Sequence, residues 1–133
     1  MSMAKILIVD DEPEIVTLLK FVLERDGHKI DEAGNGLIAL ERLGIDPPSD
    51  KTAMPDLIIL DVMMPVMDGY TLNIRLQKEE KTRAIPILVL TAKGQKMREL
   101  FEMAPNVAAY VQKPFDPKVL RELISGILRG HKN

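Results

Sequence analysis

The hydrophobic positions of this chain alternate between two periods. Short runs of four or five apolar residues recur along it, separated by segments in which apolar residues repeat every three or four positions. The short runs are typical of strands buried on both faces, and the longer period is typical of amphipathic helices. Strands that alternate with helices indicate repeated βα units and a parallel sheet. We count five units of each kind, which predicts a five-stranded α/β domain.

Capping and turn residues locate the helices. Proline is favoured at the first helical position, so we expect the first helix to begin near Pro13 and to end at Gly27. Asn35 can cap the second helix, and Asp68 followed by Gly69 marks the start of a short third helix. The remaining helices are expected over residues 97–104 and 117–128.

Residues 28–33 form the most polar of the expected strands. Charged residues alternate there with apolar ones, which suits the edge of a sheet rather than its centre. A second strand at the edge favours the strand order 2-1-3-4-5, in which the chain reverses its winding direction between the first and third strands. Residues 44–55 contain three prolines and no periodicity, so we interpret them as an unusually long surface loop.

Composition narrows the class of protein. A chain of 133 residues, 46% of them hydrophobic, is long enough for one packed domain, and we expect a single domain over residues 1–133. The formal net charge is -2, so the chain lacks the excess of positive charge that typically binds nucleic acid. The absence of cysteine excludes thiolate metal sites, and two histidines are too few for an imidazole cage. Neither a signal segment nor an 18-residue apolar stretch is present, so we expect a cytoplasmic protein.

Charged and hydroxyl side chains follow four of the apolar strand runs. Asp10 and Asp11 follow the first run, Asp61 the third, Thr91 the fourth and Lys113 the fifth. The carboxyl ends of strands in an open α/β sheet meet at one crevice, so we expect these side chains to converge. Two carboxylates about 5 Å apart repel by roughly 3 kcal/mol at an effective dielectric of about 20. The group therefore needs a cation, and Mg²⁺ fits because it prefers oxygen ligands and a phosphate partner.

A carboxylate held beside Mg²⁺ can also attack phosphorus and form an aspartyl phosphate. Asp61 is the candidate nucleophile. Lys113 can pair with one phosphoryl oxygen as a point charge, and the hydroxyl of Thr91 can donate to another. Positioned charges and donors supply most of the catalysis in phosphoryl transfer.

Four segments resemble, in order, the four motifs of the receiver domains of two-component response regulators. They are residues 6–13 (ILIVDDEP), 60–69 (LDVMMPVMDG), 90–92 (LTA) and 112–116 (QKPFD). The resemblance spans nearly the whole chain. It implies a flavodoxin-like, CheY-like fold with five parallel strands in the order 2-1-3-4-5 and five helices on both faces. It also implies a cis peptide bond between Lys113 and Pro114.

The resemblance further implies the chemistry and the partners. Asp61 is expected to accept a phosphoryl group from a sensor histidine kinase or a histidine phosphotransfer protein. Asp11, Asp61 and the backbone carbonyl of Met63 are expected to bind Mg²⁺, with Asp10 supporting through water. The domain is expected to control a downstream effector or a fused output domain, and phosphorylation could drive homodimers. No direct contact with nucleic acid or membrane is expected.

Thr91 and Tyr110 look like the switch pair of this family, in which the hydroxyl moves toward the phosphoryl group and the aromatic ring turns inward. The output surface is then expected around the fourth helix, the fifth strand and the fifth helix. Asn106 and Val107 stand where such domains usually carry Gly and Ala. Two outcomes stay open for Tyr110: a ring that still turns inward beside Val107, or one that cannot.

Met63 and Lys93 occupy two variable positions that influence how long the phosphoryl group survives in this family. A long apolar thioether at Met63 could shield phosphorus from water, and Lys93 could attract anionic phosphodonors. We therefore expect a lengthened phosphoryl lifetime.

Two other classes compete with this interpretation. Magnesium phosphohydrolases that resemble haloacid dehalogenases also use an aspartyl nucleophile, but they need a second acid two residues later, where this chain has Met63. Receiver-shaped modules that are never phosphorylated generally lack one of the acids or the lysine, and this chain has all of them. The sequence therefore favours a phospho-accepting switch over an enzyme. It is compatible with both a stand-alone regulator and the front part of a longer protein.

Overall fold

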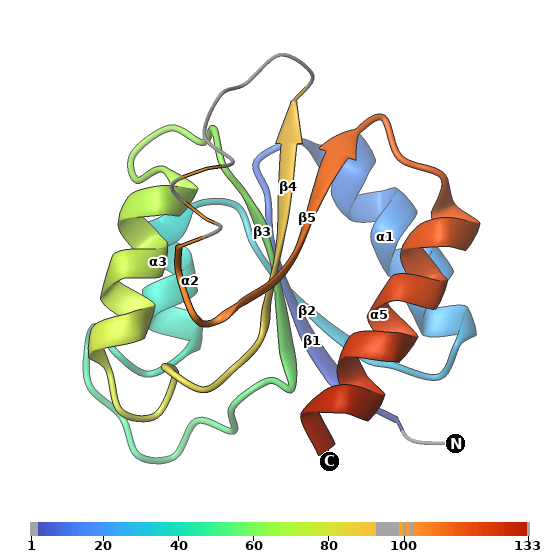
Figure 1. The fold of residues 1–133 in the computed structure, drawn as a ribbon. Helices are drawn as coiled ribbons and strands as arrows, with labels where there is room; N and C mark the ends of the chain where they lie inside the picture. The colour runs from blue at the N-terminus through green and yellow to red at the C-terminus, as the bar shows by residue number, and fades with distance from the viewer. Residues whose placement is uncertain (1–2, 93–98, 100, 102, 133) are drawn as a thin grey trace.

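The computed structural model of the protein describes residues 3–92, 99, 101 and 103–132. In these residues five parallel strands form one sheet in the order β2-β1-β3-β4-β5, accompanied by four helices (Figure 1). The strands are β1 (Lys5–Val9), β2 (Lys29–Ala33), β3 (Leu57–Asp61), β4 (Ile87–Ala92) and β5 (Val107–Lys113). The helices are α1 (Pro13–Arg25), α2 (Gly36–Arg42), α3 (Gly69–Lys78) and α5 (Pro117–Lys132).

The observed strand order confirms the predicted topology. β2 lies at one edge of the sheet, as its polar sequence predicted, and β1 lies between β2 and β3. Half of the residues of the helix expected over 97–104 lie outside the described residues. The peptide bond between Lys113 and Pro114 is cis, which confirms that expectation.

The sheet separates two hydrophobic cores. α1 and α5 cover one face, and α2 and α3 cover the other (Figure 1). Because successive side chains of a strand point to opposite faces, Ile6 and Ile8 pack toward α1 and α5, whereas Leu7 and Val9 pack toward α2 and α3. The central strands are therefore apolar at nearly every position, and their polar residues are left for the strand ends.

Two caps and one close approach set the helix starts near the carboxyl edge of the sheet. The side chain of Asn35 accepts a hydrogen bond from the backbone N–H of Ile38, and the side chain of Asp68 accepts one from Thr71. A Cβ at Gly69 would lie 2.2 Å from the carbonyl oxygen of Asp61. Only glycine allows α3 to begin this close to the end of β3.

The long loop before β3 is held to the rest of the fold by lysine. Nζ of Lys81 donates to the carbonyl oxygens of Gly44 (2.6 Å) and Ser49 (2.9 Å), and Nζ of Lys5 donates to that of Ala53 (2.9 Å). Gly44 has a φ of 67°, a conformation that favours glycine. Within the described part of the chain, no helix is both long enough and apolar enough to cross a membrane.

Candidate functional site

Three carboxylates meet where β1 and β3 end side by side. Val9 pairs with Leu60 across the two strands, so Asp10, Asp11 and Asp61 follow at the same edge of the sheet. One oxygen from each of the three lies within 4.8 Å of the others. Asp10 and Asp61 are buried, with exposed fractions of 2% and 4%, whereas Asp11 is exposed. The predicted convergence of the carboxylates is confirmed.

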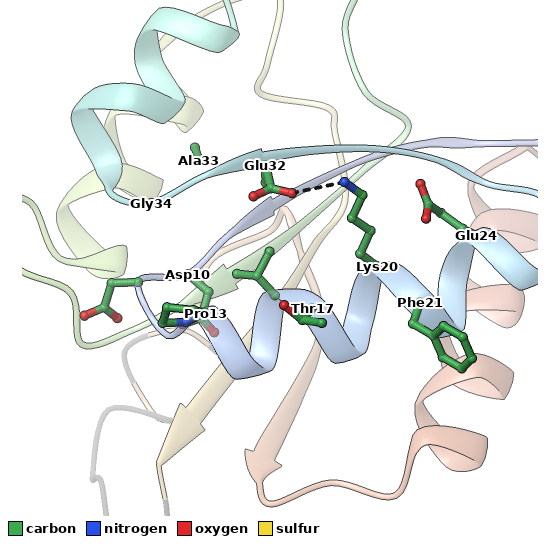
Figure 2. Close-up of a pocket in the computed structure, with 11 residues that line it drawn as sticks. Asp10, Pro13, Thr17, Lys20, Phe21, Glu24, Glu32, Ala33 and Gly34 are labelled. Atoms are coloured by element: carbon green, nitrogen blue, oxygen red, sulfur yellow. Dashed lines mark ion pairs between the residues drawn. The ribbon is translucent and has the colours of Figure 1, made fainter.

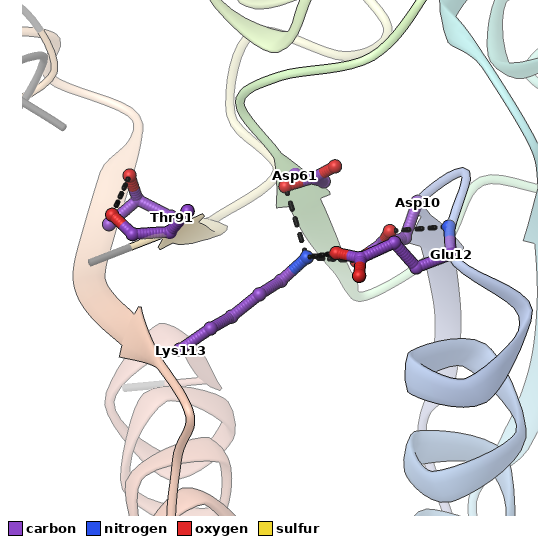
Figure 3. A network of polar contacts seen from close by, with 6 residues as sticks. Asp10, Glu12, Asp61, Thr91 and Lys113 are labelled. Atoms are coloured by element: carbon purple, nitrogen blue, oxygen red, sulfur yellow. Dashed lines mark hydrogen bonds and ion pairs between the residues drawn. The ribbon is translucent and has the colours of Figure 1, made fainter. Parts of the chain in front are cut away.

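Lys113 reaches the carboxylates from the end of β5 (Figure 3). Its Nζ lies 3.0 Å from Oδ2 of Asp10, 3.2 Å from Oδ1 of Asp61 and 2.6 Å from Oε1 of Glu12. Only 11% of the lysine side chain is exposed. The ammonium group is thus held among three carboxylates, which is the position from which it can meet an anion bound at Asp61.

Thr91 lies on β4 and Tyr110 on the adjacent strand β5. Thr91 is the second-last residue of β4, on the edge that carries the carboxylates. It is buried and donates a long hydrogen bond (3.4 Å) to the carbonyl oxygen of Ala92. Tyr110 lies on β5 opposite Val89. Its ring packs against Phe101 with ring centroids 6.1 Å apart, and its hydroxyl oxygen is buried.

Val107 and Tyr110 pack against the same core. Whether the Tyr110 ring turns when Asp61 is phosphorylated stays a prediction. The neighbouring Asn106 is buried and exchanges two side-chain hydrogen bonds with Asn73 of α3, at 2.8 and 3.3 Å. Met63 lies two residues beyond Asp61 with 62% of its surface exposed, and Lys93 lies outside the described residues.

Burial dominates the electrostatics of the site. It raises the pKa of Asp61 to about 7, the negative charge of Asp10 adds to this effect, and Lys113 opposes it. Burial likewise raises the pKa of Asp10. Burial alone would lower the pKa of Lys113, but its contacts with Glu12, Asp10 and Asp61 outweigh burial and raise it. One ammonium group cannot neutralise four carboxylates, so the fully ionised group carries a net charge of -3.

The donor set fits a hard divalent cation. Oδ2 of Asp10 is buried, and Nζ of Lys113 lies 3.0 Å from it. Burying several carboxylates beside a single ammonium group is costly unless a further cation meets them. Oxygen ligands from Asp10, Asp11 and Asp61 are of the kind that Mg²⁺ binds. A divalent ion would reduce the net charge of the group from -3 to -1.

Two of the carboxylates, those of Asp10 and Asp11, lie at the end of a hollow that runs along α1. A hollow of about 560 Å³ begins at Asp10 and Asp11 and continues between α1 and β2 (Figure 2). Pro13 and Phe21 of α1 line it, and the ion pair between Lys20 and Glu32 (3.6 Å) spans it. The hollow thus reaches the site at Asp10 and Asp11, whereas Asp61 and Lys113 do not line it.

Fold and site together define a class of protein. The sequence profile of the response regulator receiver domain matches residues 6–125, and the chain belongs to this family. Members of this family are phospho-accepting switches of two-component signalling rather than enzymes acting on a foreign substrate.

The chain is similar to receiver domains from several bacteria. It is 38% identical over 125 residues to the alkaline phosphatase synthesis transcriptional regulatory protein PhoP of Bacillus subtilis, covering 94% of this chain and 48% of PhoP. It is 32% identical to protein PilH of Pseudomonas aeruginosa, covering 96% of this chain and 100% of PilH. The chain thus spans about half the length of PhoP and the full length of PilH.

Among solved structures, the chain is similar to the receiver domain of the sensor histidine kinase PA1611 from Pseudomonas aeruginosa. The two share 26% sequence identity and a TM-score of 0.81, with 96% of this chain and 98% of the other covered. That receiver domain was solved with a magnesium ion coordinated in its active-site cleft.

Reasoning from the sequence missed one residue of the site. Glu12 follows the Asp10–Asp11 pair directly, yet it makes the shortest of the three contacts with Lys113. A third consecutive acid at a strand end was the available signal. That signal was uninformative, because acids are common just before a helix, where the partial positive charge of the helix N-terminus attracts them.

Proposed function

We propose that this receiver domain accepts a phosphoryl group on Asp61 and changes its surface in response. The observation that carries the proposal is the meeting of Asp10, Asp11 and Asp61 within 4.8 Å, with Nζ of Lys113 at 3.2 Å from Oδ1 of Asp61. A carboxylate held beside a fixed ammonium group is suited to accept an anionic group, because the ammonium group balances its charge. The donor is a phosphohistidine of a sensor histidine kinase or of a histidine phosphotransfer protein.

The chemistry is an in-line displacement at phosphorus. An oxygen of ionised Asp61 forms the new P–O bond while the P–N bond to the donor imidazole breaks and the imidazole leaves with the electron pair and takes up a proton. Lys113 balances charge on one phosphoryl oxygen, and the hydroxyl of Thr91 donates to another. The same positioned groups serve when water later attacks the phosphoryl group and releases phosphate.

Asp11, Asp61 and the backbone carbonyl of Met63 would hold Mg²⁺, with Asp10 acting through water. The bound ion would supply positive charge to the phosphoryl oxygens and lower the repulsion among the carboxylates. The net charge of -3 supports this assignment. So does the magnesium ion of the related PA1611 receiver domain.

Thr91 and Tyr110 act as the switch pair. When the Thr91 hydroxyl turns toward the phosphoryl group, the space on its other side becomes available to the Tyr110 ring, which already packs against Phe101. The resulting change of surface around β5 and α5 would control a downstream effector, a fused output domain or a second copy of the chain. We place the protein in the cytoplasm and treat residues 1–133 as one receiver domain.

The test is the mass of the protein after incubation with acetyl phosphate and Mg²⁺. We expect the gain of one phosphoryl group, its loss on chelation of Mg²⁺, and no gain in Asp61→Asn. Asp50→Asn is the matched control, because Asp50 is exposed and lies in the loop before β3. Phosphorylation of Asp61→Asn, or none in the control, would contradict the proposal.

A second assay separates the switch from an enzyme. Incubation with phosphomonoesters should yield no multiple turnovers, because Met63 stands where a phosphohydrolase needs its second acid. Repeated turnover that Asp61→Asn abolishes would instead assign the site to hydrolysis.

A further inference from the structure

We propose that Glu12 competes with the phosphoryl group for Lys113 and thereby slows phosphorylation by anionic donors. This inference rests on the proposed function, because it concerns the acceptance of a phosphoryl group at Asp61. Glu12 lies outside the acid triad and would act through Lys113. It would be a positioning residue that keeps the ammonium group occupied while Asp61 is unphosphorylated.

The contact between Glu12 and Lys113 is direct and short. Nζ donates to Oε1 of Glu12 at 2.6 Å, compared with 3.0 Å to Asp10 and 3.2 Å to Asp61. Figure 3 shows the lysine side chain extended from β5 toward the carboxylates, with Glu12 at its end. A charge-assisted hydrogen bond of this length is among the stronger polar contacts in a protein.

The position of Glu12 on α1 argues that this contact is specific. Glu12 is the N-cap residue of α1, but its side chain makes no capping hydrogen bond and reaches across to β5 instead. Its backbone N–H donates to Oδ1 of Asp10 at 2.9 Å, which fixes the backbone beside the triad. The Glu12 carboxylate therefore contacts Lys113 instead of capping the N–H groups at the start of α1, which would also attract a negative charge.

The geometry of the ammonium group explains the competition. A lysine ammonium has three donors, and three carboxylates surround this one. A phosphoryl oxygen must displace one of them to reach the lysine. The side chains of Asp10 and Asp61 are 0% and 5% exposed, whereas that of Glu12 is 50% exposed. Glu12 can move into water at the lowest cost, so it is the carboxylate that gives way.

The experiment compares the second-order rate of phosphorylation by acetyl phosphate at saturating Mg²⁺ in three variants. Glu12→Gln removes the charge and keeps the size of the side chain. Glu12→Asp keeps the charge but is one methylene shorter, which weakens the contact with Lys113. Glu14→Gln is the matched control, because Glu14 is an exposed acid in the first turn of the same helix. Urea unfolding verifies that each variant is folded.

We expect Glu12→Gln to be phosphorylated roughly two- to fivefold faster than wild type, as an exposed ion pair of about 0.4–1 kcal/mol implies. Glu12→Asp should also be faster, and Glu14→Gln should match wild type. A second readout involves no covalent step: beryllium trifluoride, a phosphoryl mimic, should bind Glu12→Gln more tightly by a similar factor in calorimetry.

Three results would overturn the inference while leaving the proposed function intact. An unchanged or slower rate in Glu12→Gln would show that the contact does not restrain Lys113. Equal acceleration in Glu12→Gln and Glu14→Gln would assign the effect to net charge. Acceleration in Glu12→Gln without any in Glu12→Asp would assign it to local charge without competition. Failure of the wild-type protein to take up a phosphoryl group would instead refute the proposed function itself.

Discussion

Ionisation of Asp61 should destabilise the folded protein when no cation is bound. Burial raises the pKa of Asp61 to about 7, whereas an aspartate in an unfolded chain titrates near 3.8. Between these two values the folded state holds a proton that the unfolded state has released. The free energy of unfolding therefore falls as the pH rises from about 4 to about 7. Asp61→Asn removes this titration, so the variant should be more stable than wild type above pH 7.

The magnitude follows from the two pKa values. Each pH unit between them corresponds to about 1.4 kcal/mol, so the full interval sets an upper limit of about 4 kcal/mol. Lys113 loses one of its three carboxylate contacts in the variant, which offsets part of the gain. We expect Asp61→Asn to raise the free energy of unfolding by about 2–4 kcal/mol at pH 8. The gain should shrink steadily as the pH approaches 4.

Urea unfolding followed by circular dichroism at several pH values, with a chelator present, measures this difference. Asp11→Asn is the matched control, because it makes the same chemical change in the same triad at an exposed side chain. Its gain should be much smaller, since exposed charges interact weakly. An Asp61→Asn variant no more stable than wild type at pH 8, or a gain that does not vary with pH, would refute the reasoning.

Mg²⁺ should offset most of the difference in stability between the two proteins. A ligand at a hundred times its Kd stabilises the folded state by about 2.7 kcal/mol. Wild type should gain stability on this scale at pH 8, and Asp61→Asn should gain little because one ligand is lost. Equal stabilisation of both proteins would place the ion elsewhere.

Three further sets of substitutions test other parts of the structure. Val66 has a φ of 73° and is 71% exposed, so Val66→Gly should relieve backbone strain and raise the free energy of unfolding by about 1 kcal/mol; a less stable variant in urea would contradict this. Met63→Asn should shorten the phosphoryl lifetime, followed by mass, if the thioether shields phosphorus, and an unchanged decay rate would reject shielding. Asn73→Ala and Asn106→Ala should each cost about 1–3 kcal/mol of unfolding free energy, since each leaves a buried amide without its partner. The double variant should cost less than the sum, and strict additivity would argue against the pairing.

Local sequence patterns were enough to predict the fold. The apolar runs predicted the strands, the polar run before Ala33 predicted the edge position of β2, and Asn35 and Asp68 predicted the helix starts. These features are local because strand burial, capping and glycine conformation depend on a few adjacent residues. The order of the strands followed once one edge was identified, since parallel βα units allow few topologies.

The acid triad was also predictable, because residues at the carboxyl ends of parallel strands must share one edge of the sheet. Asp10, Asp11 and Asp61 needed only that rule, and the role of Mg²⁺ needed only the repulsion among their charges. Tyr110 marks the limit of this reasoning. Its ring contacts Phe101, which comes from a different segment of the chain, so the surroundings of the ring could not be predicted from adjacent residues.

The sequence by itself therefore determined the class of fold, the strand order and the identity of the charged residues, all of which follow from short-range patterns and strand direction. Only the tertiary structure decided which carboxylates contact the ammonium group of Lys113. Side chains separated by a hundred residues contact one another only after the sheet has formed, so the acid at position 12 did not by itself indicate a contact with Lys113. The balance between burial, which raises the pKa of Asp61, and the single ammonium group that opposes it likewise depends on the packing of three strands around one point.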